Sequence, residues 1–436
     1  MQELTVHKIH SLRGTLTVPG DKSVSQRAVM LGALAQGTTR IFHFLECDDC
    51  AHAMGAFRNM GVSLRLFHEA DETILEIAGK GLWGLSHPRE PLYLGNSGTT
   101  ARLLTGILAA QPFSSVVHGD ASLSTRPMKR ILDPLRRMGA GIAAREQAAQ
   151  EFLPFQISRA SLRGISYETP VPSAQVKSCV LLAGMYASGT TRVREPLKTR
   201  DHTERMLKMF GADIRARGRR ITIQGGRQLQ SPENLIVPGD ISSAAFFIVA
   251  ALLVPGSDVT ISGVGINPTR TGILNVLRRM GAHIRVRRRY GDELAEPTAD
   301  IRVAYSRLSS ITVDAVDVAY CIDELPILCV AASQADGTTV IRGAGELRVK
   351  ETDRIHAMVT NLRALGVQID NRDNDIVICG PRRLNGAVVS SFGDHRTAMC
   401  MAVAGLIAQE PVTISGWPCV AKSFPDFSER LLRLTG

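Results

Sequence analysis

Two hydrophobic patterns alternate along the chain, and each of them recurs. The first is a run that is apolar on nearly every side, such as AAFFIVAALLV (244–254), followed by a turn and a β-rich stretch. A helix that is hydrophobic all round is buried on every side, so this run predicts a core helix that leads into a strand. The second pattern is amphipathic and ends in glycine, as in LRRMGAHI (277–284). The glycine fits a left-handed helix C-cap, and the alternation after it predicts another strand.

Copies of both patterns follow one another at a regular interval. The amphipathic pattern stands at 57–64, 135–142, 207–214, 277–284 and 362–369, and LLRLTG (431–436) repeats its first half. The buried-helix pattern stands at 34–42, 108–119, 184–195, 252–263, 333–343 and 406–416. The predicted order is strand–helix–strand–helix–strand–strand, in units of roughly 70 residues. We therefore predict an α/β fold in which three buried helices are enclosed by sheets, twice over.

The tetrapeptide Val-Pro-Gly-Asp occurs at the start of each half, beginning at Val18 and at Val237. Each copy leads directly into a buried helix. If the chain leaves one lobe at the first copy and returns at the second, one lobe is 21–238 and the other is 1–20 joined to 239–436. The predicted hinge then lies near 18–21 and 237–240. A length of 436 residues agrees with two domains of about 200 residues each.

Small polar residues stand where each buried helix should begin. The six starts are Asp21-Lys22-Ser23, Asn96-Ser97-Gly98-Thr99, Ser173-Ala174-Gln175, Asp240-Ile241-Ser242, Asp323-Glu324 and Asp394-His395-Arg396. An N-cap role explains most of them. It does not explain Lys22, Arg27 and Arg396, because a cation at a helix N-terminus opposes the helix dipole. An anion held between the cation and the free N–H groups reverses that effect, so these three are predicted anion ligands.

A second series of cations precedes the amphipathic helices. It consists of Thr125-Arg126, Thr199-Arg200, Thr269-Arg270 and Thr352-Asp353-Arg354. Planar guanidinium groups bind phosphate and carboxylate in a bidentate way, which favours a set of anion ligands. The alternative is that Thr-Arg is only a relic of repeat ancestry. We expect that alternative for Arg270, whose replacement by alanine should then keep turnover.

Two acids are candidates for proton transfer. Asp323 stands at the start of a buried helix, and Glu351 lies between Lys350 and Arg354 in VKETDR. A partly desolvated carboxylate beside cations can be tuned toward general acid or base work. Each acid could equally be an N-cap or an ion-pair partner.

The overall charge indicates an anionic partner without identifying it. The formal net charge is +10, and aromatic residues make up 5% of the chain. Two arginine-rich segments, 214–223 and 284–293, are expected to be solvated hairpins, since a nucleic-acid surface would interleave aromatics. The eight cysteines are scattered, and Cys47-Asp-Asp-Cys50 lacks the second pair that a zinc site needs. The first residues contain no apolar signal segment, so we expect a cytoplasmic location and no membrane span.

Several motifs together resemble the 5-enolpyruvylshikimate-3-phosphate synthase family of enolpyruvyl transferases. They are VPGDKSVSQRA, LGNSGTTARLL, LSTRPM, VPSAQVKSCVLLAG, TRDHTERML, DELPILCVAAS, LRVKETDRI, DHRTAMCMAVAG and KSFPDF. The resemblance covers essentially the whole chain. It implies an inside-out α/β barrel, or prism, with two lobes of three βαβαββ repeats that close on the substrates. It also implies transfer of the enolpyruvyl group of phosphoenolpyruvate to the 5-hydroxyl of shikimate 3-phosphate in aromatic amino-acid biosynthesis. Metal, nucleotide and prosthetic group are not implied.

The resemblance also assigns residues. For shikimate 3-phosphate it implies Lys22, Ser23, Arg27, Ser173, Ala174, Gln175, Arg200, Asp323 and Lys350. For phosphoenolpyruvate it implies Lys22, Asn96, Gly98, Arg126, Gln175, Arg354, Arg396 and Lys422. Asp323 is implied as the base that takes the 5-hydroxyl proton and Glu351 as the acid that protonates the methylene carbon, with Lys22 assisting.

The chain departs from the family's commoner pattern at the phosphate loop. Many members carry Ser-Ser-Gln where this chain has Ser173-Ala174-Gln175, and a serine where it has Arg200. The combination of Ser-Ala-Gln with Arg200 resembles a second subgroup of the family. Gly98 stands where some members of that subgroup carry alanine. In family terms this glycine leaves room for the inhibitor glyphosate, so we expect glyphosate sensitivity. We also expect a monomer.

Two other functions remain open at this point. The sister enolpyruvyl transferase that acts on UDP-N-acetylglucosamine shares the fold but uses a loop cysteine, and the corresponding stretch ASLSTRPM has none. A basic nucleic-acid-binding module would explain the net charge. It would not explain why Lys22, Asp323 and Glu351 stand beside predicted helix starts.

Overall fold

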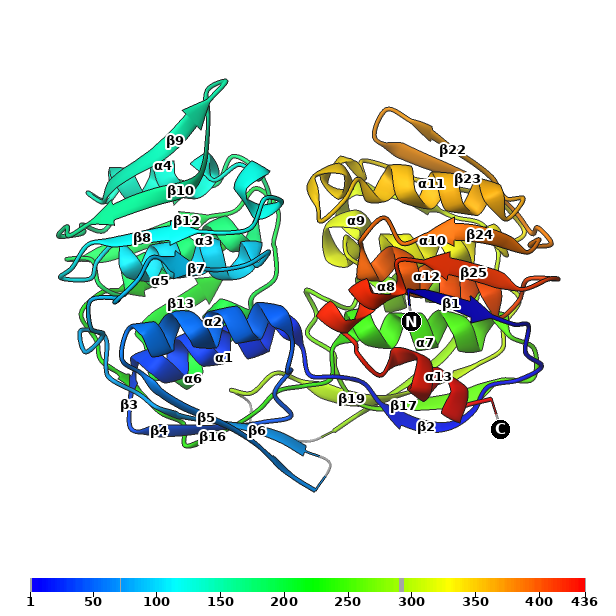
Figure 1. The fold of residues 1–436 in the computed structure, drawn as a ribbon, viewed down its shortest axis with the longest axis horizontal. Helices are drawn as coiled ribbons and strands as arrows, with labels where there is room; N and C mark the ends of the chain where they lie inside the picture. Colours follow the sequence, from blue (N-terminus) through cyan, green and yellow to red (C-terminus); the bar gives the residue numbers. More distant parts are fainter. Residues whose placement is uncertain (1, 71, 290–293, 436) are drawn as a thin grey trace. The chain divides into compact units, whose positions relative to one another are not determined.

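A computed structural model describes residues 2–70, 72–289 and 294–435, and their contacts divide them into two compact units (Figure 1). The central unit consists of Gly20–Val237 together with a short segment that ends at Glu296. The terminal unit consists of the chain up to Pro19, Pro238 to residue 289, and the chain from Pro297 onward. Each unit has its own hydrophobic core.

The central unit contains three four-stranded sheets of one topology. Their strand orders are β16-β4-β6-β5, β7-β8-β10-β9 and β11-β12-β14-β13. In the third sheet β11 (Ser166–Glu168) is parallel to β12 (Thr190–Arg194), and β14 (Arg220–Gln224) is antiparallel both to β12 and to β13 (Ile214–Arg217). The second sheet repeats this with β7 (Leu92–Tyr93), β8 (Ser115–His118), β10 (Gln150–Ser158) and β9 (Gly141–Gln147).

The first sheet of the central unit is completed from the far end of its sequence. Its consecutive strands are β4 (Thr38–Phe42), β5 (Ser63–Glu69) and β6 (Glu72–Ala78). The position that β11 fills in the third sheet belongs here to β16 (Asn234–Ile236), which pairs parallel with β4. A small parallel pair, β3 (Ala35–Gln36) with β15 (Leu229–Gln230), adds to the same closure. The unit is therefore a closed ring of three repeats.

The terminal unit repeats this plan with strands from both ends of the chain. Its sheets have the orders β18-β19-β17-β2, β20-β21-β23-β22 and β1-β25-β24. The N-terminal strand β2 (Arg13–Thr17) pairs parallel with β17 (Asp258–Gly265), and β1 (Glu3–Val6) pairs antiparallel with β25 (Val412–Ser415). The remaining strands are β18 (His283–Arg288), β19 (Thr298–Ala304), β20 (Thr312–Val313), β21 (Gly337–Ile341), β22 (Gln368–Arg372), β23 (Asp375–Gly380) and β24 (Ala387–Ser390).

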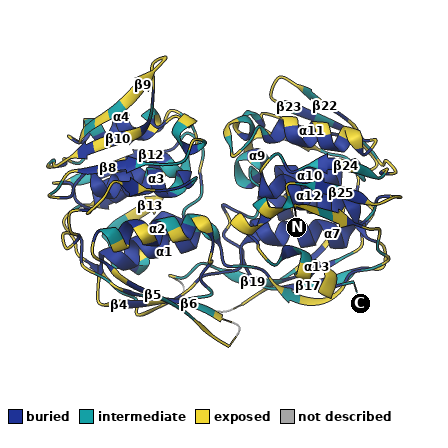
Figure 2. Cartoon of the chain, viewed as in Figure 1, coloured by how far each residue is buried: buried dark blue, intermediate teal, exposed yellow. Residues whose placement is uncertain are grey.

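Each unit has three helices inside its ring of sheets. In the central unit they are α1 (Lys22–Leu34), α3 (Gly98–Leu108) and α5 (Ala174–Gly184). In the terminal unit they are α7 (Ile241–Leu253), α10 (Leu325–Ser333) and α12 (His395–Gly405), in which every residue is buried. Figure 2 shows these helices mainly in the colour of buried residues. The prediction from their apolar sequences is confirmed.

The amphipathic helices lie outside these cores with one face exposed. They are α2 (Asp48–Asn59), α4 (Lys129–Arg137), α6 (His202–Met209), α8 (Gly272–Arg279), α11 (Arg354–Ala364) and α13 (Phe427–Arg433). Glycines follow five of them in the left-handed conformation, with φ between 81° and 107°, at Gly61, Gly139, Gly211, Gly281 and Gly366. The predicted C-caps are thus confirmed there, whereas the sixth glycine, Gly436, lies outside the described residues.

One glycine of the central core permits a close helix crossing. A Cβ built on Gly106 of α3 would lie 2.3 Å from the carbonyl oxygen of Cys179 in α5, far inside the distance of any real contact. A Cβ on Gly55 of the exterior helix α2 would have no neighbouring atom within 4 Å. Close packing therefore requires glycine at position 106, whereas at position 55 only the helix propensity of the residue matters.

Gly106→Ala is expected to destabilise the protein by about 1–3 kcal/mol or more, because backbone must move to admit the methyl group. Gly55→Ala is expected to stabilise it by about 0.5–1 kcal/mol, since alanine loses less backbone entropy in a helix. Urea unfolding of both variants measures the difference. Equal effects of the same sign would contradict the close crossing.

The two arginine-rich segments differ in how much of them is described. The first forms the hairpin β13–β14 with Arg215, Arg217 and Arg220 exposed, as predicted. Residues 290–293 of the second segment lie outside the described residues. Over the described chain, no helix combines the length and the hydrophobicity that crossing a membrane requires.

Candidate active site

The N-terminal ends of the three core helices of the central unit are joined by amide side chains. Gln26 of α1 donates from Nε2 to the hydroxyls of Ser97 (2.8 Å) and Thr100 (3.1 Å) at the start of α3. Gln175 of α5 donates from Nε2 to Thr99 Oγ1 at 3.0 Å. The polar helix starts that the sequence placed far apart therefore gather at one end of this unit.

Lys22 is the first residue of α1, where Asp21 caps the helix by accepting from Val24 N at 2.9 Å. Its ammonium group lies 3.0 Å from Asp49 Oδ2 in the first turn of α2, and both side chains are 22% exposed. The negative charge of Asp49 compensates for the unfavourable interaction between the Lys22 cation and the dipole of α1. An incoming anion would compete with Asp49 for the same ammonium group.

Arg27 lies one turn further along α1 than the helix start and is 5% exposed. It donates to the carbonyl of Ser23 (2.9 Å) and to the hydroxyls of Thr203 (2.7 Å) and Ser178 (3.2 Å). These acceptors are neutral, and burial lowers the pKa of the guanidinium to about 10 although Asp21 and Glu204 oppose this. A buried cation held by neutral oxygens is suited to an anionic ligand.

Arg126 and Asn96 form a second cationic corner of the central unit. Arg126 follows the short helix η1 (Leu123–Thr125) and donates to the Asn96 side-chain oxygen and to Ser122 Oγ at 3.2 Å. Asn96 in turn donates to Asp120 Oδ2 at 2.8 Å. Ser97, rather than Asn96, is the N-cap of α3. The Asn96 amide is thus oriented by a carboxylate and holds the guanidinium.

Gly98 lies beside the guanidinium groups of Arg102 and Arg126. A Cβ at that position would be 2.8 Å from Nη1 of Arg102 and 3.3 Å from Nη1 of Arg126. Both atoms are ends of flexible side chains, so alanine would shift the guanidinium groups rather than the backbone.

Arg102 was not predicted as a site residue from the sequence. It donates from Nη1 to Gln175 Oε1 at 3.1 Å and to the Gly98 carbonyl at 3.3 Å, and from Nη2 to the Pro127 carbonyl at 3.2 Å. It therefore fixes the Gln175 amide between α3 and α5. Its position one turn inside α3, on the side of Gly98, is the signal that points to it.

The remaining predicted residues of the central unit stand at α5 and before α6. Ser173 caps α5 by accepting from Val176 N at 3.4 Å, and Ala174 is the first helical residue. Ser23 follows Lys22 in α1. Arg200 lies in the loop between β12 and α6, next to Thr199, and its charge acts on Arg27.

In the terminal unit, the fully buried Arg354 is surrounded by acids. Its guanidinium lies 2.9 Å from Asp394 Oδ2, 2.5 Å from Glu351 Oε2 and 3.3 Å from Asp323 Oδ1. Burial alone lowers the pKa of Arg354, but Glu351, Asp394 and Asp323 outweigh it and raise the pKa above its usual value. Burial raises the pKa of Asp394, and Arg354 and His395 reverse this to a net lowering. Asp394, the N-cap of α12, was predicted only as a helix start.

The other predicted residues of this unit lie around Asp323. That residue stands two positions before α10, whose N-cap is Glu324, so it does not itself open the helix. Arg396 of α12 donates from Nη1 to the Asp323 carbonyl at 3.2 Å. Lys350 ends the short helix η2 (Gly345–Val349), and Lys422 ends η3 (Trp417–Lys422) and donates to the Gly393 carbonyl at 3.5 Å.

Arg270 belongs to a separate buried ion cluster. It is 3% exposed and donates to Asp240 Oδ1 at 3.2 Å and Ser242 Oγ at 2.8 Å. Glu324 Oε1 lies 3.7 Å away and accepts from Ser242. The carboxylates of Asp240 and Glu324 thus neutralise Arg270 near the start of α7, the buried helix that has no lysine at the position of Lys22. Arg270 is therefore a structural ion and more than a relic of the repeat.

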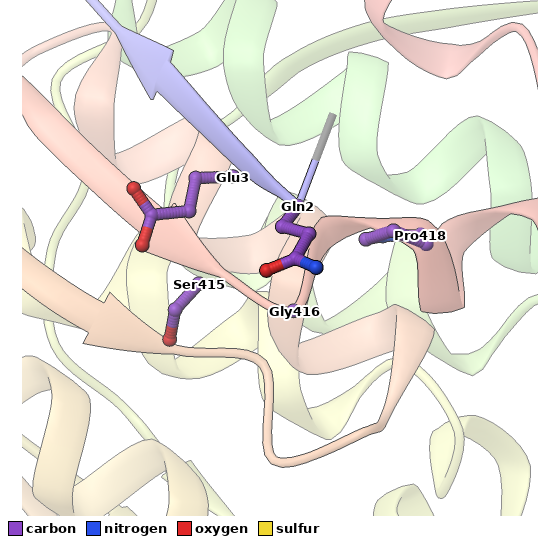
Figure 3. A pocket seen from close by; sticks show the side chains of 5 residues that line it. All are labelled: Gln2, Glu3, Ser415, Gly416 and Pro418. Carbon is purple, nitrogen blue, oxygen red and sulfur yellow. The ribbon is translucent and has the colours of Figure 1, made fainter.

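A hollow of about 340 Å³ lies elsewhere on the terminal unit, beside the N-terminal strand (Figure 3). It is lined by Gln2, Glu3, Ser415, Gly416 and Pro418. Its charged lining residue is the acid Glu3, so it does not favour a phosphorylated ligand. Over the described ranges, no group of three or more His, Cys, Asp or Glu side chains is arranged to hold a metal ion.

Comparison with known proteins agrees with this architecture. A family model described as EPSP synthase (3-phosphoshikimate 1-carboxyvinyltransferase) matches residues 6–431. A 3-phosphoshikimate 1-carboxyvinyltransferase of Citrifermentans bemidjiense is 50% identical over 427 residues, which is 98% of each chain. One from Pelobacter propionicus is 51% identical over 436 residues, or 99% of each chain.

Solved structures give the same result. The EPSP synthase from Acinetobacter baumannii aligns with a TM-score of 0.89 at 45% identity, covering 100% of this chain and 98% of that one. The enolpyruvyl transferase NikO from Streptomyces tendae aligns with a TM-score of 0.79 at 21% identity over 99% of this chain and 97% of that one, a likeness of fold alone. The predicted α/β fold class is confirmed. With its full length matched at this identity, the chain belongs to the EPSP synthase (3-phosphoshikimate 1-carboxyvinyltransferase) family.

Proposed function

We propose that this protein transfers the enolpyruvyl group of phosphoenolpyruvate to the 5-hydroxyl of shikimate 3-phosphate and releases inorganic phosphate. The observation that carries this function is membership of the family over residues 6–431, at about 50% identity to named relatives. The reaction belongs to aromatic amino-acid biosynthesis. The cationic groups at the helix starts suit two substrates that each carry phosphate and carboxylate.

Shikimate 3-phosphate is proposed to bind mainly on the central unit. Its phosphate is assigned to Ser173, Gln175 and Arg200, where the free N–H groups at the start of α5 add to the charge of the arginine. The first turns of α1 contribute Lys22, Ser23 and Arg27. Asp323 and Lys350 are assigned, with these three residues, to the ring hydroxyls, the carboxylate or their surroundings.

Phosphoenolpyruvate is proposed to bind to cations of both units. The central unit contributes Lys22, Arg126 and Gln175, beside Asn96 and Gly98, and the terminal unit contributes Arg354, Arg396 and Lys422. Arg354 donates to Asp323 and to Glu351, so a substrate carboxylate would compete with both acids for its N–H groups. Binding then releases these two acids for proton transfer.

The proposed chemistry is addition followed by elimination. Asp323 takes the 5-hydroxyl proton as the oxygen attacks C2 of phosphoenolpyruvate, while Glu351 protonates C3 and Lys22 assists proton transfer. The tetrahedral adduct then loses a methyl proton and phosphate, which re-forms the C2–C3 double bond and gives the enol ether of shikimate 3-phosphate. Lys22, Arg126 and Arg396 stabilise the departing charge.

Three further properties are part of the proposal. The chain passes from one unit to the other between Pro19 and Gly20 and again between Val237 and Pro238. We assign the hinge of lobes 21–238 and 1–20 with 239–436 to the segments near 18–21 and 237–240. The protein acts as a monomer in the cytoplasm. We propose neither nucleic acid nor membrane as a partner. Aromatic residues make up 5% of the chain, whereas a single-stranded nucleic-acid surface uses aromatic side chains for base stacking.

Phosphate release measured with both substrates tests the function. Turnover is expected with shikimate 3-phosphate and not with UDP-N-acetylglucosamine. The reverse preference would establish the sister activity instead. A salt-dependent gel shift with random RNA, in the absence of any turnover, would favour the nucleic-acid alternative.

Glyphosate is expected to inhibit the enzyme in competition with phosphoenolpyruvate, and Gly98→Ala is expected to weaken that inhibition. The added methyl group reaches the guanidinium groups of Arg102 and Arg126, so the KM for phosphoenolpyruvate should also rise. Inhibition constants at low phosphoenolpyruvate measure both effects. Gly55→Ala is the matched control, since nothing lies near its Cβ. Inhibition of the unchanged enzyme only at tens of millimolar would refute the sensitivity.

A further inference from the structure

A buried lysine, Lys177, lies directly behind the proposed phosphate site. It stands on α5 one turn after the N-cap, and its backbone N–H donates to the Ser173 carbonyl at 3.1 Å. Its side chain is completely buried, and the ammonium group lies 3.1 Å from Glu195 Oε2 and 2.7 Å from Glu204 Oε1. Lysine is almost never fully buried unless it is paired, so this arrangement requires an explanation.

The same ammonium group reaches the loop that carries Arg200. Lys177 Nζ donates to the carbonyl oxygen of Thr199 at 3.4 Å. Glu195 Oε1 accepts from the backbone N–H of Thr199 at 3.2 Å and also from the Thr199 hydroxyl. Every polar group of Thr199 is therefore bound by the Lys177–Glu195 pair, one residue before Arg200.

Stability alone gives a weak reason for this pair. Removing two charges from water is unfavourable, and replacing a buried ion pair by apolar residues is often neutral or stabilising. Burial also raises the pKa of Glu204, against the opposing effect of Lys177. Within the described structure, Glu204 Oε2 has no hydrogen-bond partner.

We propose that Lys177 and Glu195 are positioning residues, which fix the Arg200 loop against the start of α5 so that Arg200 and Ser173 present one phosphate site. This inference rests on the proposed function and deepens it. Lys177 does not touch the substrate. Its contribution is to join, by charge, the two elements from which the phosphate ligands come.

Two variants at position 199 test the path through Glu195. Thr199→Val keeps the shape of the side chain but removes the hydroxyl donor, whereas Thr199→Ser restores a hydroxyl. The affinities for shikimate 3-phosphate and for shikimate, which lacks the phosphate, are measured by calorimetry. A mutation that misplaces a catalytic or binding side chain by about 1 Å can reduce the rate about 100-fold, so a displaced Arg200 should bind the phosphate less well. Thr199→Val is expected to weaken shikimate 3-phosphate binding about ten-fold without changing the affinity for shikimate, and Thr199→Ser to restore it.

Lys177→Met combined with Glu204→Gln removes one buried charge of each sign and is expected to give the same selective loss. The KM for shikimate 3-phosphate should rise while the KM for phosphoenolpyruvate stays constant. Glu204→Gln alone leaves the path from Lys177 through Glu195 to Thr199 intact and should not change the ratio of affinities. Arg136→Met with Glu151→Gln removes another ion pair of the same unit, at 2.6 Å, and is the external control.

The outcomes are distinguishable. If the unchanged protein does not bind shikimate 3-phosphate, the proposed function fails. If it binds but Thr199→Val and the double variant keep the normal ratio of affinities, the positioning role is overturned. Equal weakening of shikimate and shikimate 3-phosphate, or loss of folded structure in Thr199→Val, would also overturn it, because either result indicates a general structural role.

Discussion

Lys22→Met is expected to reduce the turnover of shikimate 3-phosphate and phosphoenolpyruvate by about 10²–10⁴-fold and to leave the protein folded. The ammonium group opposes the dipole of α1, so its removal does not destabilise that helix. Its ion pair with Asp49 is partly exposed and contributes about 1 kcal/mol or less. Initial rates of phosphate release at saturating substrates, together with thermal unfolding, measure the two effects separately.

Lys129→Met is the matched control. Lys129 is also the first residue of a helix in the central unit, at the start of α4, and was not predicted as a ligand. Its replacement should leave turnover close to normal. A similar loss in both variants would show that the position of a lysine at a helix start says nothing about catalysis, and the role assigned to Lys22 would then be wrong.

The repeat architecture could be predicted because its signals are local. Apolar runs specify the buried helices, and glycine after an amphipathic helix specifies its cap, as at Gly139 and Gly281. The strands that close each ring could not be assigned in this way. β16 completes the first sheet of the central unit, and β1 completes the last sheet of the terminal unit. Such pairings join segments that are far apart in sequence, and the sequence of a short strand does not indicate which other strand it pairs with.

Residues of the candidate site could be predicted where the residue type is unfavourable for its predicted structural position or recurs in several repeats. Lys22 is unusual at a helix start, and Arg126 belongs to a recurring pair. Arg102, Asp394 and Lys177 carry no such contradiction. Arg102 and Lys177 are ordinary helical residues in sequence, and their importance depends on what other repeats place beside them. Asp394 is a normal N-cap whose second oxygen binds Arg354.

Arg270→Ala is expected to have the largest effect on stability, a loss of about 3–5 kcal/mol in the free energy of unfolding, because it leaves Asp240 and Glu324 buried without their cation. Molecules that remain folded should keep turnover, since Arg270 was not predicted as a substrate ligand. Urea unfolding and phosphate-release rates at low temperature separate these effects. Arg270→Met combined with Glu324→Gln should recover part of the lost stability, because it removes a charge of each sign.

Arg302→Ala in the same unit distinguishes burial from pairing. Arg302 binds Asp258 in an ion pair of 2.5 Å, closer than the 3.2 Å contact between Arg270 and Asp240, but both side chains of the Arg302–Asp258 pair are exposed. If short distance decided the contribution, Arg302→Ala would be the more damaging change. We expect the opposite, because water replaces the lost partner at Arg302 and cannot do so at Arg270. A larger loss at Arg302 would contradict the argument that burial decides the contribution, and no loss at Arg270 would leave that arginine as the repeat relic that its sequence first indicated.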